Sequence, residues 1–369
     1  MKLCLLRLHN HQWCFLLCNI ILFHALLFGG DIVEEFLLQS SPAAYSDRLV
    51  LELRERARKL ELSESINTSL LFPINTEACH PQQDLLILTI ILTSPGNTSQ
   101  REALRNSWVK QTLVNHITLR TVFFTGSSAL GEEIEMIRLE SVKFGDIVQF
   151  KGGVSRGGLM RGHWERVKMA LRWVLLYCSQ ARFIILAEDS VYLNLPALSS
   201  YLLGLRTHPD DLYLGRVIHR AAPERDPDKP SYLPYQVYSD KFLPDYCSGP
   251  AFLLSQDVVR KIYVAGEDVS LTLPSDILIG LCAKRAGVVA THSARFSGNR
   301  HIRYNPCCYN FLFSSAGVGP GLMGVVWRDL GAEKGHSCGL LQTYYSLVVC
   351  KAMTYLDKLP FLNNKNQRD

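Results

Sequence analysis

The stretch DLLILTIILTSPG (residues 84–96) decides the fold of this chain. Leu85 to Leu92 is a continuous apolar run, and Ser94-Pro95-Gly96 follows it as a turn signal. A short apolar run of this kind is typical of a β-strand that is buried on both faces, as the strands of parallel sheets are. The sequence therefore predicts a core built on a parallel sheet.

The segments that follow alternate between strand and helix patterns. Further strands are predicted over 117–124, 147–150 and 183–186, and helices over 101–111, 132–139 and 163–178. This alternation is typical of an α/β fold with a doubly wound, mostly parallel sheet of the Rossmann type. Because ligands of such sheets bind beyond the carboxyl ends of the strands, residues 94–96, 125–127 and 188–190 are expected near one crevice.

The N-terminus has the pattern of a membrane anchor. From Leu8 to Gly30 the sequence contains no Asp, Glu, Lys or Arg. A helix of that length reaches roughly 34 Å at about 1.5 Å per residue, enough for a hydrocarbon core. Basic residues precede the stretch and acidic residues follow it, which favours a cytosolic tail over 1–11, a signal-anchor transmembrane helix over 12–30 and a lumenal remainder. A cleaved signal peptide is the alternative, but no small-residue cleavage site follows the apolar run.

The lumenal part is expected to begin with a stem. Residues 31–82 are assigned to this stem, and residues 83–369 to a single domain. Within the stem, LVLELRERARKLEL (49–62) has the charge-rich pattern of an amphipathic helix. It fits either a short dimerisation helix or a solvated stem helix, and the solvated helix is favoured because coiled coils need more heptads.

The cysteines agree with a lumenal location. Of the 11 cysteines in the chain, those beyond the anchor are Cys79, Cys178, Cys247, Cys282, Cys307, Cys308, Cys338 and Cys350. An even number in an oxidising compartment suggests disulfides, whose pairing the sequence leaves open. The sequons at Asn67 and Asn97 are predicted to be glycosylated in that compartment. No C-x-x-C pair occurs, which argues against a structural zinc site.

The charge distribution excludes other classes of function. A net charge of +5 is slight for 369 residues, and the basic residues are scattered along the chain. Nucleic acid is therefore not an expected partner. A cytosolic dinucleotide enzyme is also disfavoured, because no G-x-G-x-x-G follows the first strand.

Two acidic residues follow the apolar strand FIIL (183–186). Glu188 and Asp189 come one residue after this run, so their carboxylates are expected where the strand ends. Acids at such a position often hold a divalent cation that binds a diphosphate, since hard oxygen ligands suit Mg²⁺ or Mn²⁺. An isolated Glu-Asp pair is more often a turn or helix cap, so other motifs must decide between the two interpretations.

Those motifs occur in order along the chain. They are ILTSPGNTSQREALRNSW (91–108), FFTG (123–126), FIILAEDSVYLNLPAL (183–198), PDYCSGPAFLLSQDVV (244–259) and LPSDILIGLCAKRAGV (273–288). Together these blocks resemble the beta-1,3-galactosyltransferase family, glycosyltransferase family 31, over about residues 85–330. The first block matches the family pattern R-x-x-(I/L)-R-x-(T/S)-W at Arg101, Leu104, Arg105, Ser107 and Trp108.

The resemblance implies a GT-A fold and a Golgi transferase. The implied activity is an inverting transfer of galactose or an N-acetylhexosamine from a UDP-sugar, in beta-1,3 linkage, to a glycan acceptor. Asp276 would deprotonate the acceptor hydroxyl, and Mn²⁺ held by Glu188 and Asp189 would neutralise the departing UDP. The expected partners are the UDP-sugar, a glycoprotein or glycolipid acceptor, the membrane through one helix, and a second copy or another transferase.

The resemblance also implies donor-binding residues outside the acidic motif. Ser94, Arg101 and Arg105 belong to the loop and helix after the first strand, and Lys168 matches a family lysine in the helix over 163–178. Guanidinium groups in this loop fit a phosphate, or acidic groups of the core, equally well. A structural role beside Trp108 is therefore as good an expectation for one of the two arginines.

The departures from the family pattern gather at the expected site. Ser190 stands at the third position of the family's D-D-D, Ser275 at the Glu of E-D-V, and Ala316 where a His ligates the ion. A hydroxyl and a methyl group cannot replace a carboxylate and an imidazole, so metal affinity should fall. His292 and His301 are candidate replacement ligands.

A second consequence concerns charge. The segment KGGVSRGGLMRG (151–162) replaces a family loop. Arg156, Arg161 or Lys168 is a candidate for supplying positive charge without metal, and a solvated loop is the plainer alternative.

Two functional interpretations follow. The first is an enzyme, favoured by Asp276 and by the intact block at 101–108. The second is a non-catalytic relative that serves as a lumenal chaperone or binding partner of a glycosyltransferase, favoured by Ser190, Ser275 and Ala316.

Overall fold

The computed structural model describes residues 10–33, 47–62, 70–79, 84–114, 117–152, 159–205, 210–269, 271, 273–331 and 338–356. The predicted glycosylation site Asn67 and the candidate cation Arg156 lie outside these residues, as does the side chain of Arg161.

An eight-stranded sheet forms the centre of the molecule. Its strands are β1 (Leu85–Leu92), β2 (Leu113–Val114), β3 (Ile117–Thr125), β4 (Ile147–Gln149), β5 (Phe183–Glu188), β7 (Tyr213–Gly215), β10 (Ala251–Ser255) and β11 (Ala290–His292). They follow the order β11-β7-β10-β5-β1-β3-β2, with β4 also paired to β3. The pairs β1–β3, β1–β5, β3–β4 and β7–β11 are parallel, as the apolar runs predict.

Strand β10 makes the sheet mixed. It lies between β5 and β7 and runs antiparallel to both, while β2 runs antiparallel to β3. The start of β10 therefore lies beside the end of β5, where the N–H of Glu188 donates to the carbonyl of Pro250 at 2.8 Å. This pairing brings the block at 244–259 next to the acidic motif.

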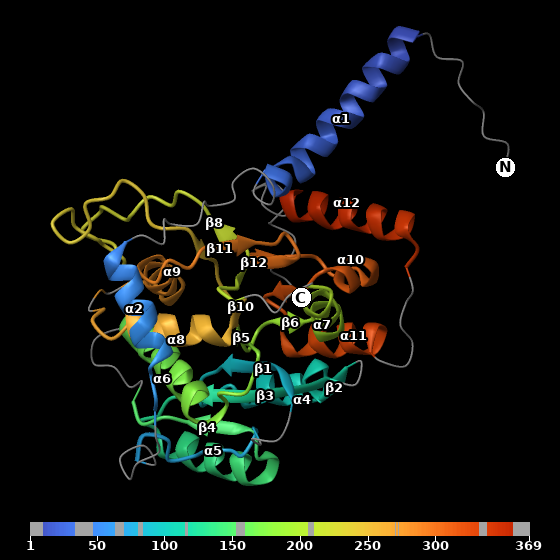
Figure 1. The fold of residues 1–369 in the computed structure, drawn as a ribbon. Coiled ribbons are helices and arrows are strands. Elements are labelled where there is room, and N and C mark those ends of the chain that lie inside the picture. Colours follow the sequence, from blue (N-terminus) through green and yellow to red (C-terminus); the bar gives the residue numbers. More distant parts are fainter. Residues whose placement is uncertain are drawn as a thin grey trace.

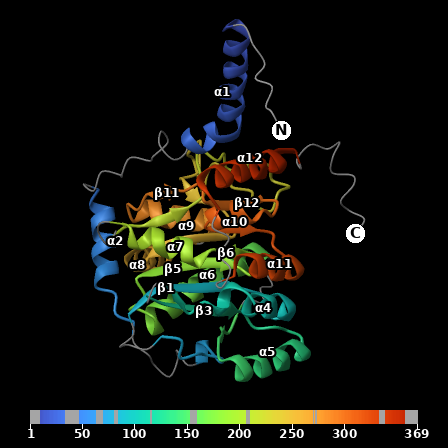
Figure 2. The same cartoon turned by 90° about the vertical axis from the view of Figure 1, so that its right-hand side faces the viewer.

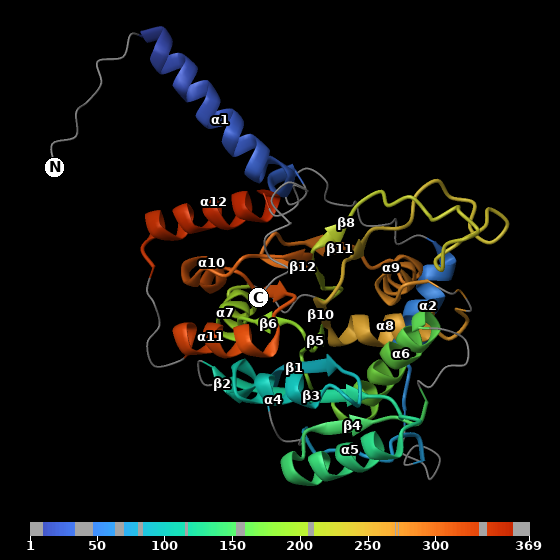
Figure 3. The same cartoon turned by 180° about the vertical axis from the view of Figure 1, so that it is seen from behind.

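Helices cover both faces of the sheet (Figures 1 and 3). One face packs α6 (Leu159–Tyr177), α8 (Gln256–Ala265) and α9 (Ser275–Arg285), and the other packs α4 (Thr98–Arg105), α7 (Leu195–Leu203), α10 (Pro306–Phe311) and α11 (Pro320–Leu330). Strand β1 shows why: Leu88 and Ile90 enter the first core cluster, and Ile87 and Ile91 the second. A strand with apolar side chains on both faces requires cover on both.

Smaller elements complete the domain. Strands β6 (Tyr192–Leu193), β12 (Phe296–His301) and β13 (Ser314–Ala316) form a second sheet, and β8 (Val217–Ile218) pairs with β9 (Tyr246–Cys247). Helix α5 (Gly131–Phe144) precedes β4, and α12 (Leu340–Leu356) follows α11. The helix predicted over 101–111 ends early: α4 stops at Arg105, and a 3₁₀ turn, Trp108–Lys110, follows. The buried indole of Trp108, which donates to the carbonyl of Val191 at 3.2 Å, fixes that turn.

Parts of the predicted stem belong to the domain. Helix α2 (Arg48–Arg58) packs along α8 (Figure 2). Its residues Val50 and Ala57 are buried. Arg54 on α2 pairs with Asp211 at 2.5 Å and donates to the carbonyl of Ala286 at 3.0 Å. The expectation of a solvated stem helix is therefore wrong, because its apolar side is used within the same chain.

Residues 70–79 also pack on the domain. Phe72 belongs to the core cluster on the α6 face, and Cys79 forms a disulfide with Cys178. A second disulfide joins Cys307 to Cys338. The expectation of disulfides is thereby confirmed. Among the described residues after α1, Cys247, Cys282, Cys308 and Cys350 are free thiols.

Helix α1 (Asn10–Ile32) includes the segment expected to span a membrane. It projects from the rest of the molecule (Figures 1 and 2). Apolar side chains such as Phe15 and Leu26 are exposed on it. Within the described ranges, no helix combines the length and apolar character needed to cross a membrane.

Candidate active site

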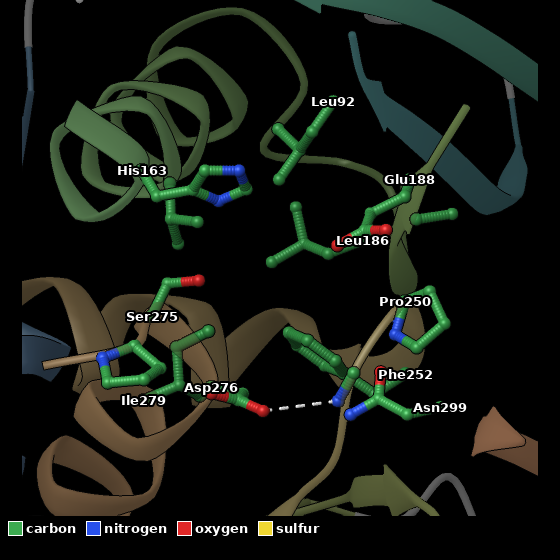
Figure 4. A pocket seen from close by; sticks show the side chains of 14 residues that line it. Leu92, His163, Leu186, Glu188, Pro250, Phe252, Ser275, Asp276, Ile279 and Asn299 are labelled. Atoms are coloured by element: carbon green, nitrogen blue, oxygen red, sulfur yellow. Dashed lines mark hydrogen bonds between the residues drawn. The ribbon is translucent and has the colours of Figure 1, made fainter. Parts of the chain in front are cut away.

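A cavity of about 310 Å³ opens beyond the carboxyl ends of β1 and β5, where the strand order predicts a ligand site. The ends of these strands, the start of β10 and the helices α6 and α9 form its walls. Its lining residues are Leu92, His163, Val167, Leu186, Ala187, Glu188, Gly249, Pro250, Phe252, Pro274, Ser275, Asp276, Ile279 and Asn299. Figure 4 shows Glu188 on one side of this pocket, with Ser275 and Asp276 on the other.

Asp276 lies in the first turn of α9, and backbone groups hold its carboxylate. Its Oδ2 accepts from the N–H of Gly249 at 3.2 Å (Figure 4). Its Oδ1 accepts from the N–H of Ile277 at 2.9 Å. Burial raises the pKa of Asp276, while these two hydrogen bonds and nearby His163 oppose the rise. A held carboxylate with a raised pKa suits a general base.

Glu188 ends β5 and faces the same pocket. Solvent reaches this residue, and the pocket that it lines removes part of the water around its carboxylate. Burial raises the pKa of Glu188, and the charges of Asp189 and Asp276 raise it further. The structure therefore places Glu188, one of the two carboxylates assigned to donor binding, in the same pocket as Asp276, whereas Asp189 does not line it.

Asp189 is bound to the loop after β1. Its Oδ2 accepts from the Oγ1 of Thr93 at 2.6 Å and from the Nδ2 of Asn97 at 2.8 Å. The amide of Gln100 donates to the Asp189 carbonyl at 2.7 Å. Asp189 therefore ties this loop to the end of β5. A glycan on Asn97 would attach at the nitrogen that makes this contact, and glycosylation there stays a prediction.

The turn before β10 requires glycine. Gly249 has φ +71, and a Cβ at this position would meet the Oδ1 of Asn299 at 2.3 Å. The amide of Asn299 donates to the Oγ of Ser248 at 3.2 Å and so fixes that side chain. Gly249 thus permits both the backbone conformation and the close approach that present its N–H to Asp276.

His163 is a pocket residue that the sequence analysis missed. It lies on α6, opposite Ser275 (Figure 4). Burial lowers the pKa of His163, Arg166 lowers it further, and Asp276 acts in the opposite direction. Burial and Arg166 therefore favour the neutral form of the imidazole. The sequence did contain a signal for this residue. His163 and Arg166 are polar residues three positions apart on an amphipathic helix.

The predicted donor contacts of Arg101 and Arg105 are corrected by the structure. Arg101 is fully buried and forms an ion pair with Glu140, with Nε–Oε1 and Nη2–Oε2 distances of 2.9 and 2.7 Å. Arg105 pairs with Glu140 at 2.6 Å and with Asp146 at 2.7 Å. Both arginines therefore have a structural role, because their guanidinium groups form ion pairs with carboxylates of the domain. Ser94 accepts from Nη1 of Arg101 at 2.6 Å through its carbonyl.

Three further candidates, Lys168, His292 and His301, lie outside the pocket lining. Lys168 is half-buried, and its charge acts on Cys282 of α9. His292 accepts from the N–H of Val217 at 3.2 Å, and burial lowers its pKa to about 4. His301 is hydrogen-bonded to the carbonyl of Ala316 at 3.2 Å.

The acidic motif does not fit a three-ligand metal site. Both hydrogen bonds described for the Asp189 carboxylate occupy Oδ2, Ser190 offers a hydroxyl, and Ala316 offers a buried methyl group. Among the described residues, no three His, Cys, Asp or Glu side chains are grouped so that they could hold a metal ion. Mn²⁺ and Mg²⁺ sites need several oxygen ligands. We therefore assign no step of the reaction to a metal.

Comparisons with known proteins agree with this architecture. The family model described as Galactosyltransferase matches residues 99–294. Human beta-1,3-galactosyltransferase 9 is 39% identical over 358 residues, covering 97% of this chain and 95% of the relative. Lactosylceramide 1,3-N-acetyl-beta-D-glucosaminyltransferase of Xenopus tropicalis is 30% identical over 310 residues, covering 78% of each chain. Its human namesake is 28% identical over 300 residues, covering 77% of each.

Proposed function

The chain belongs to the galactosyltransferase family, and on that premise we propose that it is an inverting, UDP-sugar-dependent hexosyltransferase acting on glycan hydroxyls in beta-1,3 linkage. The observation that carries the proposal is the pocket at the ends of β1 and β5, in which Glu188 lies across from Asp276. The relatives named as galactosyl- and N-acetylglucosaminyltransferases support the reaction class.

In the proposed reaction Asp276 acts as the base. The acceptor hydroxyl gives its proton to the Asp276 carboxylate, and its oxygen forms a bond to the anomeric carbon of the donor sugar. The bond between that carbon and the β-phosphate oxygen breaks, and its electron pair leaves with UDP. Attack opposite the leaving group inverts the configuration. The hydrogen bonds from Gly249 and Ile277 hold the carboxylate in place for this step.

The names of the relatives suggest two classes of donor sugar. One relative is named for transfer of galactose and others for transfer of N-acetylglucosamine. We propose galactose or an N-acetylhexosamine as the transferred sugar, and a glycoprotein or glycolipid as the acceptor. We also propose that the chain associates with a second copy of itself or with another transferase.

We also propose that the domain works in the Golgi lumen, attached to the membrane by the N-terminal segment. The disulfides Cys79–Cys178 and Cys307–Cys338 support an oxidising compartment. The charge-free sequence before Asp31 supports the attachment. Alkaline extraction and protease protection of membranes from expressing cells test this directly. A protein that is released by alkali, or digested in sealed vesicles, would contradict it.

The activity is tested with the purified full-length chain. UDP-galactose, UDP-N-acetylglucosamine and UDP-N-acetylgalactosamine are each incubated with acceptors that end in galactose, glucose or N-acetylhexosamine. Mass spectrometry detects the added sugar, and NMR gives the linkage and the anomeric configuration. We expect one donor class to yield a beta-1,3 product. Failure of the chain to bind UDP, with or without Mn²⁺, would discard the enzyme and leave the non-catalytic alternative.

A further inference from the structure

The proposed function raises a question about charge at the pocket. A nucleotide diphosphate is anionic, and Glu188 and Asp276 both face the space that it would enter. Burial of like charges without compensation is costly. Because the acidic motif does not fit a three-ligand metal site, a cation must come from elsewhere.

Arg166 meets this requirement by its position. It lies on α6 one turn after His163 and directly before Val167, and both of these neighbours line the pocket. At 3.6 residues per turn, Arg166 projects about 60° around the helix from His163. The charges of Asp189 and Glu188 act on the Arg166 guanidinium group. This interaction indicates that the group lies near the end of β5.

The guanidinium group of Arg166 lacks the ion pairs that Arg101 and Arg105 have. Its Nε is enclosed and has no hydrogen-bond partner. No ion pair joins it to any residue that the structure describes, whereas Arg101 and Arg105 pair with carboxylates in the core. A guanidinium group stays protonated when buried, so leaving it unpaired costs free energy.

Arg172 shows that an enclosed Nε alone is not enough. It lies on the same helix, and its Nε also has no partner. Its charge, however, acts on Tyr263 of α8 rather than on pocket carboxylates. Arg166 differs because it lies beside both the pocket and the acidic end of β5.

We propose that Arg166 replaces the metal ion in this protein, its planar guanidinium group binding the diphosphate of the donor so that donor binding needs no divalent cation. The five N–H groups of an arginine match phosphate oxygens, often in pairs. The charges of Glu188 and Asp189 act on this guanidinium group without forming an ion pair with it, and the diphosphate would supply the acceptors that it lacks. This inference rests on the proposed UDP-sugar function.

The test is calorimetric titration of UDP and of uridine into the purified full-length chain, in EDTA and in MnCl₂. Wild-type protein should bind UDP in EDTA with an affinity within about twofold of that in Mn²⁺. Arg166→Gln should weaken UDP binding about 10- to 100-fold, as expected for loss of charged hydrogen bonds, and leave uridine binding unchanged. Arg166→Lys, which keeps the charge without the planar fork, should lose less affinity.

Arg172→Gln is the matched control and should bind UDP as wild type does. Circular dichroism melting curves establish that each variant is folded. The comparison of UDP binding in EDTA and in Mn²⁺ uses wild-type protein, so it does not depend on the folding of a variant. UDP binding by wild type only when Mn²⁺ is present would overturn the role of Arg166 while leaving the transferase proposal intact. Full UDP affinity of folded Arg166→Gln would also overturn it. Absence of UDP binding in both buffers would end both proposals together.

Discussion

The backbone N–H of Gly249 donates a hydrogen bond of 3.2 Å to the Oδ2 of Asp276, joining the turn before β10 to the first turn of α9. Gly249 holds a φ of +71, with the Oδ1 of Asn299 in the place that a side chain would take. The orientation of the proposed base therefore depends on the absence of a side chain at residue 249.

Replacement of Gly249 tests this dependence. Gly249→Ala should lower kcat about 10- to 100-fold, because small misplacements of a catalytic group are costly, and should change UDP affinity little. Gly131→Ala is the control, since a Cβ there meets nothing within 4 Å. Steady-state kinetics and UDP titration check both variants. A Gly249→Ala enzyme with the kcat of wild type would show that this hydrogen bond does not position the base.

Glu188 should destabilise the folded protein. Its pKa is raised by burial and by Asp189 and Asp276, so the folded state resists its ionisation. The cost appears as the pH rises through the ordinary pKa of Glu and is complete above the raised pKa. Glu188→Gln should therefore raise Tm at pH 7.5, and the gain should disappear as the pH is lowered through this range. Differential scanning calorimetry at several pH values checks this; an equal gain at every pH would refute the electrostatic cause.

The buried ion pairs of Glu140 should stabilise the fold strongly. Loss of Glu140 leaves the buried charge of Arg101 without a carboxylate partner, at a cost of about 3–5 kcal/mol. Glu140→Ala should show this loss in urea unfolding. Glu135→Ala, which removes the exposed pair with Arg138, should change stability little. Similar effects of the two substitutions would contradict the buried assignment.

The disulfide Cys79–Cys178 should anchor residues 70–79 to the domain. It closes a loop with a sequence separation of 99, for which chain entropy predicts a contribution of about 4–5 kcal/mol. The double variant Cys79→Ser/Cys178→Ser should lose much of this stability in urea unfolding. Peptide mapping without reduction should find the two cysteines linked in wild type. A different pairing would contradict the fold of this segment.

The sequence predicted those parts of the fold that local patterns determine. The apolar runs of β1 and β5 identified buried parallel strands, and the rule for strand ends located the pocket beside Glu188. Asp276 came from the family motif. No strand was predicted at β10, and its antiparallel direction has no local signal, because an apolar strand has the same pattern in either direction.

The remaining differences depend on contacts between distant residues. Glu140 forms an ion pair with Arg101 across a sequence separation of 39, and no local sequence pattern indicates such a pair. Helix α2 was predicted to be solvated, but it packs on α8 and is part of the domain. The positions of His163 and Arg166 beside the acids follow from the orientation of α6, which is fixed only when the helix packs on the sheet.

The most direct test of the account is the rate of sugar transfer by Asp276→Asn, measured together with its affinity for UDP. The amide keeps the size of the side chain but cannot accept the acceptor's proton. We predict that transfer falls about 10²- to 10⁴-fold, the usual contribution of a general base, while the Kd for UDP stays within about twofold of wild type. A variant that transfers sugar at the wild-type rate would contradict the account.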